Sequence, residues 1–484
     1  MKKMKLLIFI LLVTFLVIVF LYGIFGTGIS YLSSREIKQD RELNEDLIKN
    51  LKINDIDVAY DKNNNTYYYT LSDKYENKIY VLKLELGDGL KYKLVDETLN
   101  IVKVNYNKPI DIIIYNDKYY YETKIQLTNL PIIMIDYKNQ IGLENVNGIF
   151  TYINNEYSQK TFTNNIKIKV RGATTYNLPK KPYRINFYNK TYTEEKKVSF
   201  SNFYIGDSLV LDGVYREHSK IRNVLSTELW NDISDDFTDI DMYSEFVEVF
   251  LNDEYVGLYV LNEPVNRTKF KLNKTTENDT SFVVKSTSGY HEIKYPNNEN
   301  YFLEIDNKIN FILSNYFEKR TNSSYESIVN TFDIKNYIDI IIYNYFINNI
   351  DNRLEQNVYY YNNSLNENFV YIQPWDMEWT FGRTYNHKIS EANIFDCTLK
   401  HENSEKINKL IINRYWELRK SIITEDYFND LIDRYLEILN KGATSRDSNR
   451  WYYYDINEEL TYIKNWIRDR IKYTDEKIRE LENE

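Results

Sequence analysis

An apolar run near the amino terminus is the feature that most restricts what this chain can fold into. Residues 6–25 form 20 consecutive positions without a charge, and a helix of that length spans a hydrocarbon core of ~30 Å. Lys2, Lys3 and Lys5 precede the run, which places the amino terminus in the cytoplasm. A cleaved signal peptide is the alternative, but its apolar region covers only about 7–15 residues and ends at a small-residue cleavage site. We therefore expect an uncleaved signal anchor in residues 1–29, a single-pass membrane protein, and an extracellular carboxyl-terminal domain.

Composition excludes several classes of function for the remaining residues. The chain of 484 residues has a formal net charge of -10 and no long Lys/Arg tract, so we expect no nucleic-acid partner. Cys397 is the one cysteine, which rules out an internal disulfide and a cysteine-based zinc site. The four histidines are scattered and form no H-E-x-x-H motif, which argues against zinc hydrolase chemistry.

The residues after the apolar run divide by pattern into a spacer and a β-rich module. Residues 30–52 are charged and helix-like, as in a juxtamembrane spacer. Residues 53–127 alternate polar and apolar side chains in short runs bounded by Asn, Asp and Gly, which predicts strands. We interpret this stretch as a small β-sandwich-like module that acts as a spacer or a binding module. Exposed tyrosines that stack on sugar rings would make carbohydrate binding a further possible function.

Residues 128–484 mix strands with helices and end in a helical part, so the predicted fold class is α+β. Apolar residues from Ile334 to Phe346 recur at helical spacing, and Asp333 precedes them as an N-cap. The other expected elements are strands over 131–136, 166–171 and 183–188, a hairpin over 246–261, a helix over 222–233 and an amphipathic helix over 456–481.

Three polar residues around a second predicted hairpin are candidates for chemistry. Asp351 follows the helix that ends near residue 346, Asn357 precedes an aromatic strand, and Asp376 follows the return strand of residues 369–374. The open end of such a hairpin would bring these two carboxylates and one amide together, and hard oxygen ligands of this kind suit Mg²⁺. A phosphotransferase uses the same residue types to orient a hydroxyl and to hold the metal. Capping and turn formation are the alternative roles of Asp and Asn at loop ends.

Ordinary nucleotide-binding motifs are absent from the sequence. It contains neither G-x-x-x-x-G-K-[ST] nor G-x-G-x-x-G, and it lacks H-R-D and D-F-G. A nucleotide would therefore have to be held by another scaffold.

Five sequence blocks follow one another between residues 170 and 451. They are 170–187 (VRGATTYNLPKKPYRINF), 218–225 (HSKIRNVL), 246–263 (FVEVFLNDEYVGLYVLNE), 374–382 (PWDMEWTFG) and 449–451 (NRW). In this order they resemble the blocks of the CotH spore-coat protein kinases, a family of atypical protein kinase-like enzymes. The resemblance covers the chain from about residue 130 to its carboxyl end.

The resemblance implies an atypical protein kinase-like domain that uses ATP and Mg²⁺. Asp351 falls at the catalytic aspartate, Asp376 at the metal-binding aspartate and Asn357 at the second metal ligand. The spacing from Asp351 to Asn357 is six residues where the family pattern has five, and Gln356 occupies the expected place. Either the loop absorbs one extra residue or Gln356 is the ligand.

Charged residues in the other blocks are candidates for nucleotide binding. Lys181 and Arg184 flank a predicted strand and would neutralise a triphosphate, although a solvated basic loop would look the same in sequence. Arg222 would contact either phosphate or an acidic side chain. Glu263, at the end of a strand, resembles a position near the nucleotide.

We therefore expect a membrane-anchored kinase that faces outward and phosphorylates Ser or Thr of surface or spore-coat proteins. The alternative is an envelope or spore-coat structural protein that kept the fold but has little or no catalytic activity.

Overall fold

The structure of the chain is a computed structural model that describes residues 51–484 apart from several short segments. The segments left out are 96–99, 157–159, 173–174, 201–203, 235–240, 277–279, 288–289, 315–322, 350, 352–355, 364–368, 384–398 and 403. The predicted membrane anchor and nearly all of the predicted spacer fall in residues 1–50, outside the described residues. Among the helices that are described, none combines the length and the apolar character needed to cross a bilayer.

Residues 52–128 form a module of short strands whose apolar core continues into the following region through Ile132, Ile153, Phe250 and Tyr255. Its three sheets have the orders β3-β4-β10-β9-β7, β2-β1-β6 and β5-β8. Tyr67, Tyr69 and Tyr106 are buried in the core, so these tyrosines are not available to stack on sugars. The strands are β1 (Lys52–Ile53), β2 (Ile56–Asp57), β3 (Ala59–Asp61), β4 (Thr66–Thr70), β5 (Ile79–Val81), β6 (Leu84–Glu85), β7 (Lys91–Leu94), β8 (Ile101–Lys103), β9 (Ile110–Tyr115) and β10 (Tyr120–Thr128), with a 3-10 turn η2 (Asp73–Tyr75).

Seven strands of the next region close into a barrel of order β11-β12-β13-β14-β17-β19-β18. The strands are β11 (Ile132–Tyr137), β12 (Val146–Ile153), β13 (Thr161–Val170), β14 (Tyr183–Tyr188), β17 (Ser208–Asp212), β18 (Ser244–Leu251) and β19 (Tyr255–Asn262), and the connections carry η3 (Thr175–Asn177), β15 (Val198–Phe200) and β16 (Tyr204–Gly206). A parallel pairing of β11 with β18, in which Ile132 lies opposite Glu248, closes the barrel. The expected hairpin is confirmed, and its turn places Asn252 and Asp253 at φ 49° and 61°, as tight hairpin turns require.

The third region is a four-stranded sheet of order β21-β20-β22-β23 with helices packed around it. Its elements are α2 (Arg222–Ser234), β20 (Phe282–Thr287), β21 (Tyr290–Tyr295), η4 (Glu299–Tyr301), α3 (Phe302–Ile312), α4 (Tyr325–Val329), α5 (Ile334–Ile347), β22 (Val358–Asn362), β23 (Tyr371–Pro374), α6 (Glu405–Leu418), α7 (Glu425–Leu439), α8 (Ala443–Arg450) and α9 (Ile456–Asn483). The expected helix α5 is confirmed, with the Asp333 side chain accepting the Asn336 N–H at 3.0 Å as its N-cap. The predicted α+β class is also confirmed.

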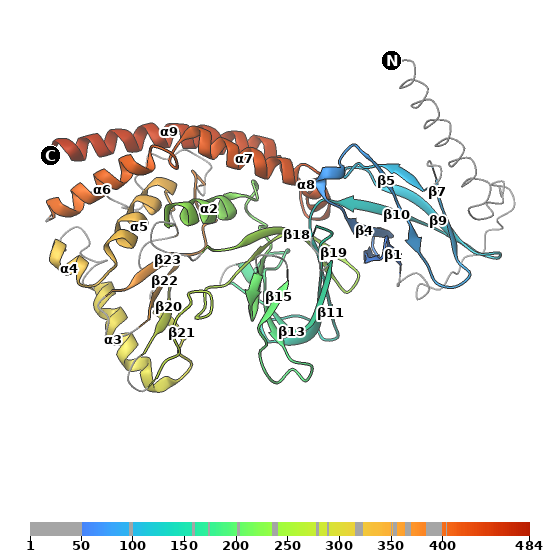
Figure 1. The fold of residues 1–484 in the computed structure, drawn as a ribbon, viewed down its shortest axis with the longest axis horizontal. Coiled ribbons are helices and arrows are strands. Elements are labelled where there is room, and N and C mark those ends of the chain that lie inside the picture. The colour runs from blue at the N-terminus through green and yellow to red at the C-terminus, as the bar shows by residue number, and fades with distance from the viewer. Residues whose placement is uncertain are drawn as a thin grey trace, which may run out of the picture.

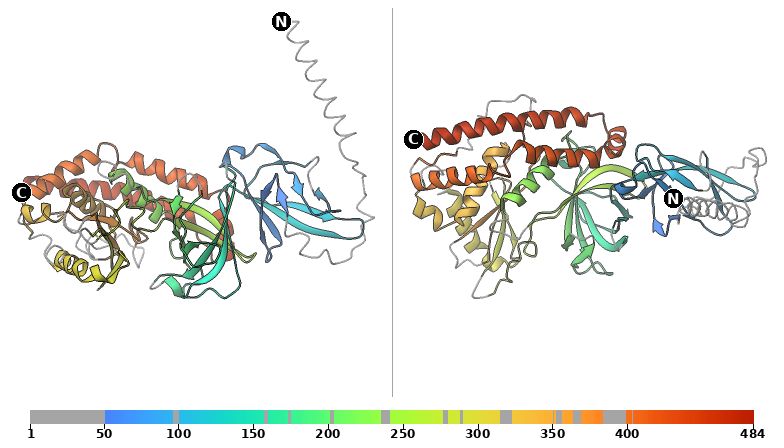
Figure 2. Two further views of the ribbon diagram at one scale, coloured as in Figure 1. Left: turned by 60° about the horizontal axis from the view of Figure 1, so that its bottom comes forward. Right: turned by 45° about the horizontal axis from the view of Figure 1, so that its top comes forward.

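The three regions lie side by side along the long axis of the molecule. Figure 1 shows the β-rich module at one end, the barrel in the middle and the helices with their sheet at the other end. The two rotated views in Figure 2 show the same order, with α9 running along the helical end. Contacts between α8 and β19 join the carboxyl-terminal helices to the barrel.

Candidate active site

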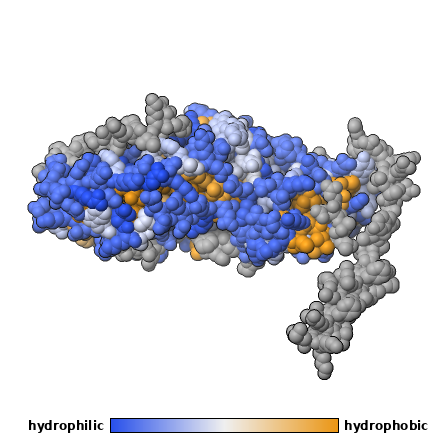
Figure 3. Space-filling view, turned by 90° about the horizontal axis from the view of Figure 1, so that it is seen from above, coloured by the Kyte–Doolittle hydropathy of each residue, from blue (hydrophilic) through white to orange (hydrophobic). Residues whose placement is uncertain are grey.

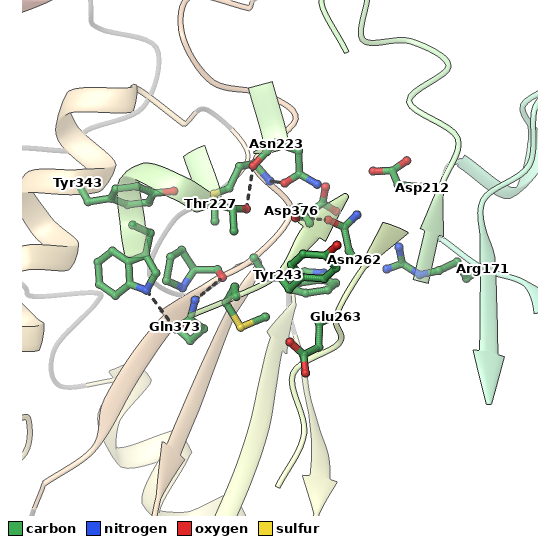
Figure 4. A pocket seen from close by; sticks show the side chains of 16 residues that line it. Arg171, Asp212, Asn223, Thr227, Tyr243, Asn262, Glu263, Tyr343, Gln373 and Asp376 are labelled. Atoms are coloured by element: carbon green, nitrogen blue, oxygen red, sulfur yellow. Dashed lines mark hydrogen bonds between the residues drawn. The ribbon is translucent and has the colours of Figure 1, made fainter. Parts of the chain in front are cut away.

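A pocket opens between the barrel and the four-stranded sheet, with about 530 Å³ of empty space including its solvent-open part. The barrel contributes the ends of β13, β17 and β19 and the start of β18, while the other wall comes from α2, α5 and the residues around the end of β23. Figure 4 shows these side chains converging from elements that are far apart in the sequence. The lining residues are Arg171, Asp212, Asn223, Thr227, Trp230, Met242, Tyr243, Ser244, Asn262, Glu263, Tyr343, Gln373, Pro374, Trp375, Asp376 and Met377.

Asp376 reaches this pocket from a turn that follows β23. The residue has φ 63° and is exposed, and no hydrogen bond or ion pair joins its carboxylate to a described residue. The turn is fixed on its far side, because the Met377 N–H donates to the Asn223 side chain at 3.2 Å. The sequence-predicted metal ligand therefore lies at the pocket on a held backbone with its carboxylate facing solvent.

Asp212, at the end of β17, supplies a second carboxylate to the same pocket. Burial raises the pKa of Asp212, the Val214 N–H lowers it by hydrogen bonding at 3.0 Å, and the charge of Asp376 raises it again. Asp212 and Asp376 line the same pocket. Two carboxylates in one cleft attract a divalent cation.

Of three neighbouring cations, Arg171, Lys285 and Arg184, only Arg171 is among the residues that line the pocket. Arg171 lines the pocket directly after β13, and Figure 4 shows its guanidinium pointing toward the side where Asp212 and Asp376 lie. Burial lowers the pKa of Lys285, Arg171 lowers it further, and Asp376 raises it. Burial likewise lowers the pKa of Arg184, with Arg171 adding to the effect. Within the described residues, none of the three cations forms an ion pair, and Arg184 donates only to the neutral side chains of Asn186 and Ser208.

Asp351 and Asn357 lie together next to the Asp376 turn. The Asn357 Nδ2 donates to the Asp351 Oδ2 at 3.0 Å, and the Gln356 Nε2 donates to the Oδ1 at 2.8 Å. The Trp375 N–H donates to the Asn357 carbonyl at 3.0 Å, so the residue before Asp376 is bonded to Asn357. Of the three residues predicted to meet at the open end of the hairpin, Asp351 and Asn357 are bonded to each other and, through the Asn357 carbonyl, to the backbone of Trp375. Asp376 follows Trp375 and lines the pocket, whereas Asp351 and Asn357 are not among the lining residues.

Arg222 lies at the start of α2, and its side chain is engaged away from the pocket. It pairs with Glu217 at 2.6 Å and with Glu459 at 3.4 Å, and it donates to the Thr380 carbonyl at 3.1 Å. Of the two roles left open by the sequence, the structure shows the acidic partner. Because Thr380 belongs to the same turn as Asp376, Arg222 holds the loop that carries the candidate metal ligand.

The other two predicted nucleotide contacts differ in their placement. Glu263 lines the pocket, is buried, and pairs with Lys269 at 2.6 Å. Burial raises the pKa of Glu263 and Lys269 opposes the effect. Lys181 does not line the pocket, and it donates to the Tyr176 carbonyl at 2.7 Å at the surface. Its neighbour Lys180 is buried and pairs with Asp447 at 2.5 Å.

Sequence reasoning did not assign a role to three residues that line the pocket, Arg171, Asp212 and Asn223, nor to Lys285, whose pKa is influenced by Arg171 and Asp376. For Asp212 a signal existed, since a carboxylate directly follows the apolar run Leu209–Leu211 and precedes Gly213. For the others, only the closure of the barrel and the pairing of β20 with β22 bring them to one place.

The two carboxylates of the pocket suit Mg²⁺ better than a metal ion whose ligands all come from protein side chains. Within the described residues no three His, Cys, Asp or Glu side chains are grouped as for a metal ion. Mg²⁺ commonly takes one or two carboxylates and completes its shell with water and phosphate oxygens, which is what Asp212 and Asp376 offer beside Arg171.

Comparison with known proteins decides the family. A family model described as CotH kinase protein matches residues 168–474, which is more than half of the chain. The chain belongs to the CotH kinase family. A search of curated proteins returned no match. All of the pocket-lining residues fall inside the CotH match, whereas the β-rich module of residues 52–128 falls outside it. Membership in the CotH family suggests kinase-like transferase activity.

Proposed function

We propose that this CotH family member transfers the γ-phosphoryl group of ATP to Ser or Thr hydroxyls of surface or spore-coat proteins, with Mg²⁺ as the required metal. The observation that carries the proposal is the unpaired charge in the pocket. Asp212 and Asp376 face Arg171, and none of the three forms an ion pair with a described residue. Charged groups of both signs at one opening suit a ligand that itself carries both signs, and a metal–nucleotide complex is such a ligand.

The chain's own residues have separable tasks in this proposal. Asp212 and Asp376 would hold the metal, with Asn357 adjacent, and the metal when bound neutralises charge on the phosphates. Arg171, Arg184 and Lys285 would bind phosphate oxygens, which pair well with cationic donors. Glu263 and Trp375 lie on the pocket wall beyond the charged group, where the rest of the nucleotide would be bound.

Asp351 would orient the acceptor hydroxyl and take its proton. The hydroxyl oxygen bonds to the γ-phosphorus, the bond from that phosphorus to the β–γ bridging oxygen breaks, ADP leaves, and the proton goes to the Asp351 carboxylate. Amide donors from Gln356 and Asn357 hold both oxygens of this carboxylate, which fixes its orientation.

A direct test uses the full chain in detergent with labelled ATP and Mg²⁺, scoring label on the chain itself and on native surface proteins. We expect transfer by the wild type and a loss of at least 100-fold in Asp376→Asn. Asp430→Asn on the exposed side of α7 is the matched control, with unchanged transfer expected. Absence of transfer by the wild type, or equal transfer by Asp376→Asn, would contradict the catalytic proposal.

A non-catalytic envelope or spore-coat protein is the second candidate function. The observation that favours it is that both Gln356 and Asn357 use their amide hydrogens on Asp351, in a turn one residue longer than the family pattern. Thermal unfolding separates the two candidates. Stabilisation by ATP that requires Mg²⁺ supports the kinase, whereas a melting temperature indifferent to nucleotide supports the structural role.

A further inference from the structure

The small sheet β5-β8 of the amino-terminal module presents an apolar face to solvent. Ile79 is 73% exposed and Val81 is 56% exposed. Their cross-strand partners are Lys103 and Ile101, and directly opposed residues of an antiparallel pair lie on the same face. A surface sheet of this kind normally places polar side chains outward, so this face has the opposite pattern.

The inward side of the same two strands is an ordinary core. Tyr80 hydrogen-bonds the side chains of Asn54 and Tyr69 at 3.1 and 3.3 Å, and Val102 and Val104 are buried. The inward side chains of these strands already pack in a buried core. The exposed Ile79 and Val81 are therefore not needed for that core.

Lysines surround the apolar face. Lys78 and Lys83 flank the strand that carries Ile79 and Val81, and Lys103 lies opposite Ile79; all three are exposed. None of the three forms an ion pair with a described residue, while the nearby acids Asp73 and Glu76 both pair with Lys441 at 3.4 Å. We name Ile79, Val81, Ile101, Lys78, Lys83 and Lys103 the β5-β8 face. Figure 3 shows an apolar area over this end of the molecule, amid the mostly polar surface of that view.

The chain enters the module beside this face. The Asn54 Nδ2 donates to the Val81 carbonyl at 3.0 Å, and the Asn54 N–H donates to the Lys83 carbonyl at 2.9 Å. The predicted spacer, residues 30–52, connects the predicted membrane anchor of residues 1–29 to this point. A peptide of that length spans roughly 25–35 Å, whether it is a flexible coil or a helix. The β5-β8 face is thus tethered within that distance of the predicted membrane.

We propose that the β5-β8 face docks on the anionic lipid surface of the membrane in which the chain is anchored. The isoleucine and valine side chains enter the interface between headgroups and acyl chains, and the three lysines bind lipid phosphates. Juxtamembrane lysines are attracted to an anionic lipid surface, and the tether keeps the face at high local concentration. This proposal rests on the predicted anchor and not on kinase activity.

Site-specific fluorescence on the full chain tests the proposal. In a Cys397→Ser background, Ile79→Cys carries an environment-sensitive dye, and the protein is reconstituted into vesicles of phosphatidylcholine with or without phosphatidylglycerol that contain spin-labelled lipid. Ile205→Cys is the matched control, because Ile205 is an isoleucine 57% exposed on β16, in the connection between two barrel strands. We expect at least threefold stronger lipid quenching at position 79 than at position 205 in phosphatidylglycerol vesicles.

The charge contribution is tested in the same vesicles. Lys78→Glu combined with Lys83→Glu and Lys103→Glu should lower quenching at position 79 to the level of position 205, with unchanged co-flotation through the anchor. Equal quenching at the two positions overturns the proposal, as does equal quenching with and without phosphatidylglycerol. A dye at position 79 that is shielded from both lipid and aqueous quenchers shows that protein covers the face, which also overturns it. Phosphoryl transfer measured on the same triple variant should match the wild type, so a failure of the kinase proposal is scored separately.

Discussion

Two clusters in this molecule each combine carboxylate with cationic side chains, but only one of them forms ion pairs among its described residues. In the pocket, Asp212, Asp376 and Arg171 face one another without ion pairs to described residues. In the second cluster, Lys180 and Lys220 share the Asp447 carboxylate at 2.5 and 3.8 Å, and all three side chains are at most 2% exposed.

The paired cluster joins α8 to the barrel. Asp447 also accepts the Leu258 N–H at 3.0 Å and the Tyr454 hydroxyl at 3.2 Å, so each carboxylate oxygen has donors. Gly257 permits this approach, because a Cβ there would lie 2.3 Å from the Asp447 Oδ1 and its φ is +112°. The comparison shows how charge is used: a cluster neutralised by the protein holds elements together, and a cluster left unneutralised is available to a ligand.

Breaking the paired cluster should have the largest effect on stability. In Lys180→Ala the only cation left beside the buried Asp447 carboxylate, among the described residues, is the more distant Lys220. Losing one partner of a buried ion pair typically costs about 3–5 kcal/mol of unfolding free energy. Lys181→Ala, one residue away and at the surface, should change the free energy of unfolding by less than about 0.5 kcal/mol. Urea unfolding measures both. Similar losses in the two variants would contradict the structural assignment of Lys180.

Glu245 sharpens the comparison, because it is a partly buried carboxyl that forms no ion pair with a described residue. Burial raises the pKa of Glu245 to about 7, against hydrogen bonds from Tyr243 and Tyr152 that lower it. The folded state therefore binds more protons than the unfolded state between pH 4.5 and 7, so this stabilisation is complete below that window and lost as pH rises through it. We expect a contribution of roughly 3 kcal/mol across the window.

Glu245→Gln stays neutral at every pH and supplies the control. As the pH rises from 5 to 8, the unfolding free energy of the wild type should fall relative to that of Glu245→Gln. A constant difference over that range would show that Glu245 ionises normally in the folded protein.

The unpaired cluster should respond to ligand rather than to mutation alone. At a concentration of Mg²⁺–ATP near 100 times the dissociation constant, binding would stabilise the wild type by about 2.7 kcal/mol. Asp376→Asn should lose this stabilisation while its melting temperature without ligand stays within a few degrees. Ligand stabilisation that survives in Asp376→Asn would remove Asp376 from the metal site.

The smallest expected effect is an increase in stability. Asp212→Asn removes one of two mutually repelling carboxylates, and Asp212 has its pKa raised by burial and by Asp376. We expect the unfolding free energy without ligand at pH 7 to rise by about 1 kcal/mol or less, while binding of Mg²⁺–ATP weakens. A loss of stability in Asp212→Asn would mean that Asp212 is already neutralised within the protein.

Local patterns predicted much of this structure. The period of apolar residues and the Asp333 cap were sufficient for α5, and the hairpins β18–β19 and β22–β23 were predicted from their flanking turns. Chain-distant pairings were beyond such reasoning. The parallel contact of β11 with β18 joins residues more than 110 positions apart, and the role of Asp212 depends on that closure. Lys180 is buried and its neighbour Lys181 lies at the surface. The alternation of polar and apolar residues does not distinguish the two, because they lie in a loop before Pro182.

The parallel closure of the barrel has a consequence for the order in which the chain assembles. Residues 132–135 cannot find β18 until residues 248–251 have been synthesised, and the Tyr255 N–H is the donor to Asp61 in the amino-terminal module. Contacts of such sequence separation form slowly. We therefore expect the edge strand of the barrel to stay unpaired on the nascent chain until about half of the protein has been synthesised. This edge is then the segment most exposed to wrong pairing during synthesis.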